Sequence, residues 1–215
     1  MNNKYVNFIP WVGESYEKGY KGKRILVLGE SHYCDDCEKC QKISMKEECH
    51  AKTEDAVSDF LDDPKGLSYK ATYTCFERNF VGRELKQEER EEFWNIIIFY
   101  NFLQYAMSGP RCGLPEKEEI EESNKAFQEI LETYRPDYII VLGFRLYKLL
   151  PELNGEGKDL KVGNEKTEVW IYQIKDKKIP ALKVAHPSSP KGKKREYWYK
   201  FIRNFLEKFA QNKLS

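Results

Sequence analysis

Two short segments, far apart in the chain, place proton-handling side chains directly after apolar runs. Glu30 and Ser31 follow the apolar run at 25–28, and His186 follows the run at 181–185. Open α/β sheets bind their ligands outside the carboxyl ends of their strands. A carboxylate at one such end and an imidazole at another therefore indicate a cleft that performs acid–base or nucleobase chemistry.

The elements that must position these side chains can be read from the apolar pattern. Unbroken apolar runs are typical of parallel strands that helices cover on both faces. Helical spacing of apolar residues lies between them. We therefore expect one domain over residues 1–215, with an α/β fold built as a three-layer α/β/α sandwich around a central, mainly parallel four-stranded sheet. The expected strands lie at 24–29, 96–100, 137–142 and 181–185, with a weaker one at 168–174 and irregular stretches at 31–50, 106–115 and 152–166.

Composition narrows the class of protein. Hydrophobic residues make up 40% and charged residues 33% of the 215 residues, which is typical of a soluble globular chain rather than a disordered one. The net charge of +1 gives no global attraction to nucleic acid, so any such binding needs a local patch. No apolar run reaches membrane-spanning length, and the start of the chain does not resemble a signal peptide. We expect a cytoplasmic monomer with no membrane partner.

Two further expected strands end at Asn101, which is polar, and at Gly143, which is conformationally permissive. The carboxyl ends of parallel strands meet at one edge of a sheet, so these residues should lie near Glu30 and His186. An asparagine amide donates and accepts hydrogen bonds at once, which suits the amide edge of a base. Taken singly, Glu30 and Asn101 could merely cap helices, but their joint occurrence favours a site.

These strand ends belong to an ordered set of short motifs. Residues 29–33 read Gly-Glu-Ser-His-Tyr and residues 186–188 read His-Pro-Ser, with Asn101, an Arg-to-Pro stretch at 111–115 and an apolar strand at 136–143 between them. In this order they resemble the uracil-DNA glycosylase superfamily. Its first motif reads Gly-Gln-Asp-Pro-Tyr, or Gly-Glu-Ala-Pro-Gly in its iron–sulfur branch, and its last motif begins His-Pro-Ser. The resemblance spans most of the chain.

The resemblance implies a uracil-DNA glycosylase-like fold and an enzyme that extrudes a nucleotide and hydrolyses its N-glycosidic bond. The substrate would be uracil or a related altered base in single- or double-stranded DNA. Glu30 would then be the carboxylate that favours the cationic sugar, Asn101 would read the base, and His186 would stabilise the departing base anion. Ser31 stands where the Gln-Asp-Pro-Tyr version has an aspartate, so it can only orient the water. A non-catalytic module that binds DNA or a nucleotide therefore remains an alternative.

Aromatic side chains complete the base-binding set that the resemblance implies. Tyr33 stands where the family has the tyrosine that blocks a thymine methyl group. Phe76 and Phe80 are the candidates to stack on the base, and either could instead belong to the core. His32 replaces the proline of the family motif, and it could be a proton carrier, a metal ligand or an exposed turn residue.

A cysteine-rich insertion at about 33–50 carries spacing typical of a metal site. In a reducing compartment such cysteines are thiols or metal ligands rather than disulfides. Thiolates in this pattern can close a tetrahedral shell around one structural zinc ion, with His50 as the alternative fourth ligand. An iron–sulfur cluster is the rival, although the cysteines of the iron–sulfur branch are not in their places here, and free thiols are the plain alternative. A hydrolase using His32 and His50 with this metal is a further candidate. The expected ligands are Cys34, Cys37, Cys40 and Cys49.

A basic run directly follows the His-Pro-Ser motif. In the glycosylase superfamily this loop presses into DNA beside the flipped base, so its cations would contact phosphates. The plain alternative is the solvated start of a helix. The expected DNA-binding residues are Ser188, Lys191, Lys193, Lys194 and Arg195.

Overall fold

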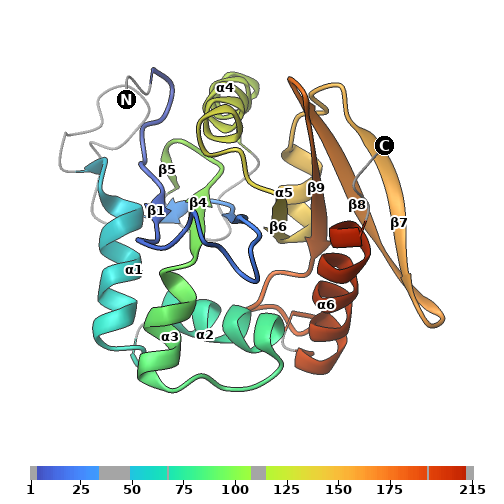
Figure 1. Cartoon of the computed structure of the whole chain (residues 1–215). Helices are drawn as coiled ribbons and strands as arrows, with labels where there is room; N and C mark the ends of the chain where they lie inside the picture. Colours follow the sequence, from blue (N-terminus) through green and yellow to red (C-terminus); the bar gives the residue numbers. More distant parts are fainter. Residues whose placement is uncertain (1–3, 34–48, 67, 108–114, 193, 212–215) are drawn as a thin grey trace.

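Strands and helices follow one another along the chain in runs of one to three elements (Figure 1). The computed structural model describes residues 4–33, 49–66, 68–107, 115–192 and 194–211. The strands are β1 (Trp11–Val12), β2 (Ile25–Gly29), β3 (His32–Tyr33), β4 (Ile97–Asn101), β5 (Ala106–Met107), β6 (Tyr138–Leu142), β7 (Glu156–Val162), β8 (Glu165–Ile174) and β9 (Lys177–Val184). The helices are α1 (Lys52–Asp62), α2 (Ser68–Val81), α3 (Gln87–Trp94), α4 (Lys117–Tyr134), α5 (Phe144–Leu149) and α6 (Arg195–Gln211).

The main sheet has seven strands in the order β1-β4-β2-β6-β9-β8-β7. Its centre, β4-β2-β6-β9, is parallel throughout, whereas β1, β8 and β7 pair antiparallel with their neighbours. The prediction of an α/β fold is confirmed. The prediction of a four-stranded sheet is wrong, because the parallel strands are the middle of a larger mixed sheet. β3 and β5 form a separate parallel pair.

Sequence reasoning missed the two-residue strands β1, β3 and β5 and the longer strand β7. Of these, β3, β5 and β7 lie in stretches expected to be irregular. Only Leu160 of β7 is buried, because β7 is an edge strand that pairs with β8 alone. An edge strand with one buried side chain leaves no apolar run to detect. The sequence signal that could have found it is Gly163, whose φ of +60° begins the two-residue turn between β7 and β8.

Successive residues of the central strands face opposite layers of helices. Ile25 and Val27 of β2 pack with α1, α2, α3 and α6, whereas Leu26 and Leu28 pack with α4 and α5 (Figure 1). All four side chains are fully buried. Covering both faces removes any need for alternation, which is why β2, β4 and β6 are apolar throughout. Burying each Leu, Ile or Val stabilises the fold by about 1.5–3 kcal/mol.

Helix α6 closes one layer with aromatic side chains at helical spacing. Trp198, Phe201, Ile202 and Phe205 are each at most 3% exposed and belong to the core beside β6 and β9. Aromatic residues at helical spacing are typical of a helix that packs on a core, and these side chains are buried accordingly. Their spacing of three and four residues puts them on one side of the helix.

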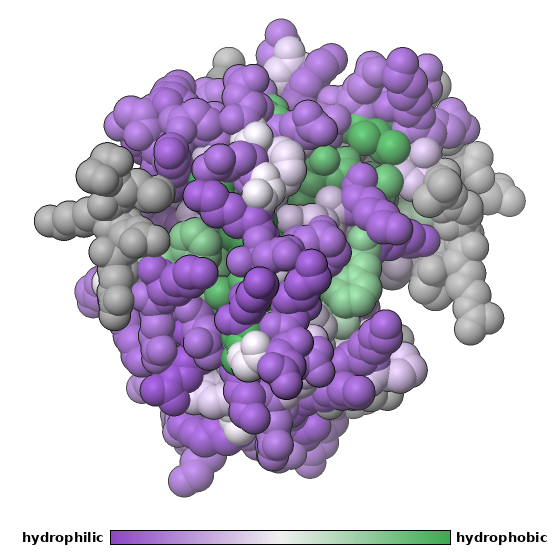
Figure 2. Space-filling view, turned by 90° about the vertical axis from the view of Figure 1, so that its right-hand side faces the viewer, coloured by the Kyte–Doolittle hydropathy of each residue, from purple (hydrophilic) through white to green (hydrophobic). Residues whose placement is uncertain are grey.

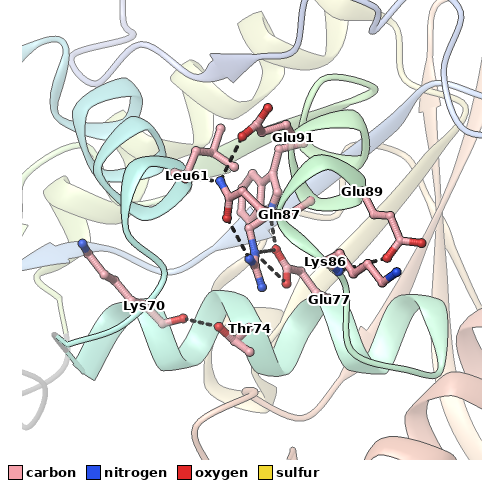
Figure 3. Close-up of polar contacts among 10 residues, drawn as sticks. Leu61, Lys70, Thr74, Glu77, Lys86, Gln87, Glu89 and Glu91 are labelled. Atoms are coloured by element: carbon pink, nitrogen blue, oxygen red, sulfur yellow. Dashed lines mark hydrogen bonds and ion pairs between the residues drawn. The ribbon is translucent and has the colours of Figure 1, made fainter.

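A buried ion pair joins α2 to α3 within the same layer. The Nε of Arg90 donates to Glu77 at 2.9 Å, and the indole Nε1 of Trp94 donates to the same carboxylate at 2.9 Å. Figure 3 shows Glu77 pointing from α2 toward α3, where Gln87 lies beside it. Burial raises the pKa of Glu77, and the Arg90 contact opposes that shift. Each charge therefore depends on its partner to remain in the core.

The face of the molecule that carries β7 is covered mostly by hydrophilic side chains (Figure 2). Lys158, Asp159 and Lys166 on the hairpin of β7 and β8 are exposed, and the last two form an ion pair at 2.9 Å. Charged side chains on an edge strand discourage pairing with another chain. Within the described residues, no helix is both long and apolar enough to cross a membrane.

Candidate functional site

The predicted strand ends do meet at one edge of the sheet. Gly29 is in register with Asn101, and Leu142 is in register with Val184. Glu30 therefore leaves β2 at the same edge where β4 ends at Asn101. Likewise, Gly143 and His186 follow β6 and β9 on the other side.

The topology makes the boundary between β2 and β6 the natural ligand position. The chain leaves β2 toward β4 on one side and leaves β6 toward β9 on the other. In open α/β sheets, the point where the connections diverge in this way is where a ligand crevice is expected. We call this expected ligand position the switch-point crevice. Glu30 stands on one side of this switch point and the segment after β6 stands on the other.

An arginine that sequence reasoning missed spans the switch point. The guanidinium of Arg145, in the first turn of α5, forms an ion pair with the carboxylate of Glu30. The Glu30 side chain is 11% exposed and that of Arg145 is 38% exposed, so the pair lies at the rim of the crevice rather than in the core. The signal that could have found it is an arginine two residues after Gly143, at the end of the third parallel strand.

The imidazole of His186 is oriented by the residues that follow it. Its Nδ1 accepts a hydrogen bond from the backbone N–H of Ser188 at 3.3 Å and lies 2.7 Å from the Ser188 hydroxyl. Because a backbone amide can only donate, Nδ1 carries no proton and the neutral ring holds its proton on Nε2. Burial lowers the pKa of His186. The charge of Glu30 raises it, and the charge of Arg145 lowers it. His186 thus offers an N–H donor without a net charge.

The loop after His186 is built around close backbone contacts. The carbonyl of His186 accepts hydrogen bonds from both the N–H and the hydroxyl of Ser189, at 2.9 and 2.7 Å. A Cβ at position 192 would lie 1.8 Å from that carbonyl oxygen, so only Gly192 fits there. These contacts hold the imidazole of His186 at the sheet edge.

Asn101 lies at the predicted edge, but its side chain faces inward. It is 5% exposed, its Nδ2 lies 3.1 Å from His32 Nε2, and its Oδ1 covers Gly29 so closely that a Cβ there would be 2.2 Å away. The amide is therefore packed between β2 and His32. To read a base, this amide would have to turn away from its present partners.

His32 is buried, so of its three alternatives the exposed turn residue is wrong. Its Nε2 lies 2.9 Å from the Thr53 hydroxyl, and its ring packs edge-on against Phe8. Burial, aided by the charge of Lys52, lowers its pKa to about 3. The ring is neutral near pH 7, and its contacts to Thr53 and Asn101 connect β3 with α1 and β4.

The aromatic residues that could stack on a base lie partly in the core and partly at the surface. Phe76 and Phe80 are 1% and 3% exposed and pack against each other in the core, so the core alternative applies to both. Tyr33 is 42% exposed, and Phe144, the first residue of α5, is 37% exposed. The exposed aromatics next to the strand ends are therefore Tyr33, which sequence reasoning named, and Phe144, which it missed.

The basic run leads from the His186 loop into α6. Ser188, Lys191, Lys194 and Arg195 are exposed, as a phosphate-binding surface requires. Lys193 lies outside the described residues. These four predicted DNA-binding residues therefore lie at the surface, in the segment that directly follows His186.

Most of the predicted metal site lies outside the described residues. Cys34, Cys37 and Cys40 fall in that part of the chain, whereas Cys49 and His50 are described and half-buried. His50 donates from Nδ1 to the carbonyl of Asn7. A metal-binding histidine usually donates its other ring N–H in this way, so this contact fits the predicted role of His50. Among the described residues alone, no three His, Cys, Asp or Glu side chains form a metal-binding group.

Neither a scan against protein-family models nor a search of curated proteins finds a match to this chain.

Proposed function

We propose that the protein is a DNA glycosylase that hydrolyses the N-glycosidic bond of uracil or a related altered base in DNA, on a uracil-DNA glycosylase-like fold. The observation that carries the proposal is the juxtaposition of Glu30, Arg145 and His186. They follow three adjacent parallel strands, β2, β6 and β9, at the switch point. A carboxylate and a neutral imidazole donor on either side of one crevice are the groups that this reaction requires.

The chemistry assigns a separate task to each group. When the bond between C1′ and the base nitrogen breaks, the electron pair leaves with the base and positive charge develops on the sugar. The carboxylate of Glu30 stabilises this positive charge. The Nε2–H of His186 donates to the developing base anion. Water then bonds to C1′, and the proton it loses passes to the departing base.

Ser31 and Arg145 have supporting tasks in this proposal. The Ser31 hydroxyl is buried without a hydrogen-bond partner in the described part of the chain, so it is free to orient water. A serine is too weak a base to deprotonate that water. Arg145 holds the Glu30 carboxylate in place, and its remaining N–H groups can bind a phosphate of the substrate.

A non-catalytic DNA- or nucleotide-binding module is the second candidate, and the position of Asn101 favours it. The Asn101 amide faces His32 and Gly29 rather than the crevice. Without a base-reading amide, the same edge could still hold a nucleotide through Arg145 and the basic loop.

The test is base release from labelled oligonucleotides, single- and double-stranded, that carry uracil, hypoxanthine or a modified cytosine. Alkali cleaves the strand wherever a base has been lost. A His186→Ala preparation, purified in parallel, controls for contaminating host glycosylases. Abasic sites made by the wild type and not by this variant support the proposal. Binding without abasic sites on any strand favours the binding module, and neither binding nor release contradicts both.

A further inference from the structure

A groove separate from the switch-point crevice lies between α2 and the beginning of α6. It encloses about 830 Å³ and is open to solvent along one side. One wall is a face of α2 that includes Cys75, Arg78 and Asn79. The other wall is the start of α6, with Lys194 and Arg195. Ligand pockets span roughly 300–1,000 Å³, so the groove has room for part of a nucleotide chain.

The groove offers cationic donors that are only partly paired within the described residues. The guanidinium of Arg78 pairs with Glu84 at 2.5 Å, but its Nε is buried and meets no hydrogen-bond acceptor among the described residues. Within the same described ranges, Lys194 and Arg195 form no ion pair. The Arg78 side chain as a whole is 37% exposed, so its outer N–H groups can reach a phosphate oxygen, and charge-assisted hydrogen bonds of this kind are strong.

The first turn of α6 adds to this positive potential. The first α-helical hydrogen bond at this end runs from the N–H of Trp198 to the carbonyl of Lys194. The amides of residues 195–197 precede it and point toward the groove end of the helix. Backbone N–H groups at a helix start favour a negatively charged ligand. The carboxylate of Glu196 opposes them in part.

Direct contacts join this groove to the candidate site. Asn79 of α2 donates to the carbonyl of Gly192 at 2.8 Å, and Trp198 of α6 donates from Nε1 to the carbonyl of Lys191 at 2.9 Å. Gly192 in turn packs on the carbonyl of His186. The segment that begins at His186 therefore leads to the groove wall at Lys194, and a strand held at His186 can continue toward the groove.

We propose that this groove binds backbone phosphates of the nucleic-acid strand whose base enters the crevice at Glu30 and His186. The proposal rests on the proposed function for the identity of the strand, and Arg78 is the residue it adds. Phosphate binding here is independent of base identity, because every contact comes from cations and amides rather than from a base-reading group.

The test is the affinity of a labelled oligothymidine, which carries no altered base, over a series of salt concentrations. Arg78→Gln and Lys194→Gln should each weaken binding and reduce the salt dependence of log K by roughly 0.7–0.9. Arg83→Gln is the matched control, because Arg83 is exposed at the end of α2 and pairs with Glu89 outside the groove. Wild-type affinity in both groove variants, or an equal loss in the control, overturns the proposal. Thermal unfolding verifies that each variant is folded, and Lys194, which is exposed, provides the test if Arg78→Gln is not.

The reactivity of Cys75 gives a second measurement, because this half-buried free thiol lines the groove. Oligothymidine should slow alkylation of the peptide that contains Cys75, as followed by mass spectrometry. Protection by inorganic pyrophosphate without protection by oligothymidine would contradict a nucleic-acid strand and indicate a small phosphorylated ligand.

The two proposals fail in different ways. If no altered base is released but oligothymidine binding depends on Arg78 and Lys194, the glycosylase proposal fails and the groove proposal stands. If base release occurs while both groove variants bind as the wild type does, the groove proposal alone fails.

Discussion

Arg145 forms an ion pair with Glu30 across the boundary between β2 and β6. The two residues are far apart in sequence, and only the adjacency of their strands brings them together. This pair joins Glu30, in the first motif of the set, to a residue that belongs to none of the motifs. The charges of Glu30 and Arg145 also shift the pKa of His186. His186 follows β9, the strand beside β6.

The pKa of His186 should change in opposite directions when the charge of Arg145 or the charge of Glu30 is removed. Arg145→Gln removes a positive charge and should raise the pKa of His186, whereas Glu30→Gln should lower it further. NMR titration of the ring protons measures this, and only three histidines need assignment. Arg145→Lys keeps the charge and is the control. Unchanged titration in both glutamine variants would contradict the proximity of these side chains.

The rate of base release should depend strongly on His186 and weakly on Ser31. His186→Ala removes the donor to the developing anion, and such a loss costs about 2.7–4 kcal/mol, or roughly 10²–10³ in rate. Ser31→Ala breaks no hydrogen bond to the described residues and should stay within about tenfold of the wild type. Single-turnover release from a uracil-containing strand compares the two. A Ser31→Ala defect as large as that of His186→Ala would contradict this division of labour.

The stability of the fold should fall on acidification because of His32. Its pKa is about 3 in the folded protein, below the ordinary value of 6.5. Between these values the unfolded chain binds a proton that the folded protein does not. The free energy of unfolding should therefore fall as pH decreases below about 6.5, by up to about 1.4 kcal/mol per pH unit.

Urea unfolding at a series of pH values measures this dependence. His32→Gln keeps a hydrogen-bonding side chain but cannot titrate, so its stability should vary less steeply between pH 6.5 and 4 than that of the wild type. The same steepness in both proteins would show that other groups control the acid response.

The ion pair between Glu77 and Arg90 should respond to single and double substitution in different ways. Glu77→Ala leaves the guanidinium of Arg90 buried without its partner and should cost about 3–5 kcal/mol in urea unfolding. The double substitution Glu77→Leu with Arg90→Met removes both charges and keeps apolar volume. It should be less destabilising than Glu77→Ala, and the reverse order would contradict a partner-dependent charge in the core.

The metal prediction rests on the cysteine spacing, because Cys34, Cys37 and Cys40 lie outside the described residues. Elemental analysis of untagged protein should find one zinc ion per chain. Cys49→Ser should lower that content, whereas Cys75→Ser, at the groove, should not. Absence of stoichiometric metal would contradict the prediction, and a brown protein containing iron would favour the iron–sulfur alternative. Removal of a structural zinc by a chelator should lower the melting temperature.

The sequence by itself determined the parallel centre of the sheet and its chemically active edge. Residues 25–28 and 138–142 are apolar without interruption, and a strand with that pattern must be covered on both faces. Once such strands are parallel, their carboxyl ends share one edge, so Glu30, Asn101 and His186 could be placed together from local pattern alone. The core aromatics of α6 followed for the same reason, because helical spacing is a local property.

Tertiary structure decided which side chains face the crevice and which face the core. Nothing local shows that Asn101 turns toward His32, that Phe76 lies inside the helical layer, or that Arg145 reaches Glu30. Each of these depends on a neighbour distant in sequence, and burial against that neighbour selects one orientation among several that the local backbone permits. The edge strand β7 is a similar case, because its place comes from hydrogen bonds to β8 rather than from an apolar run of its own.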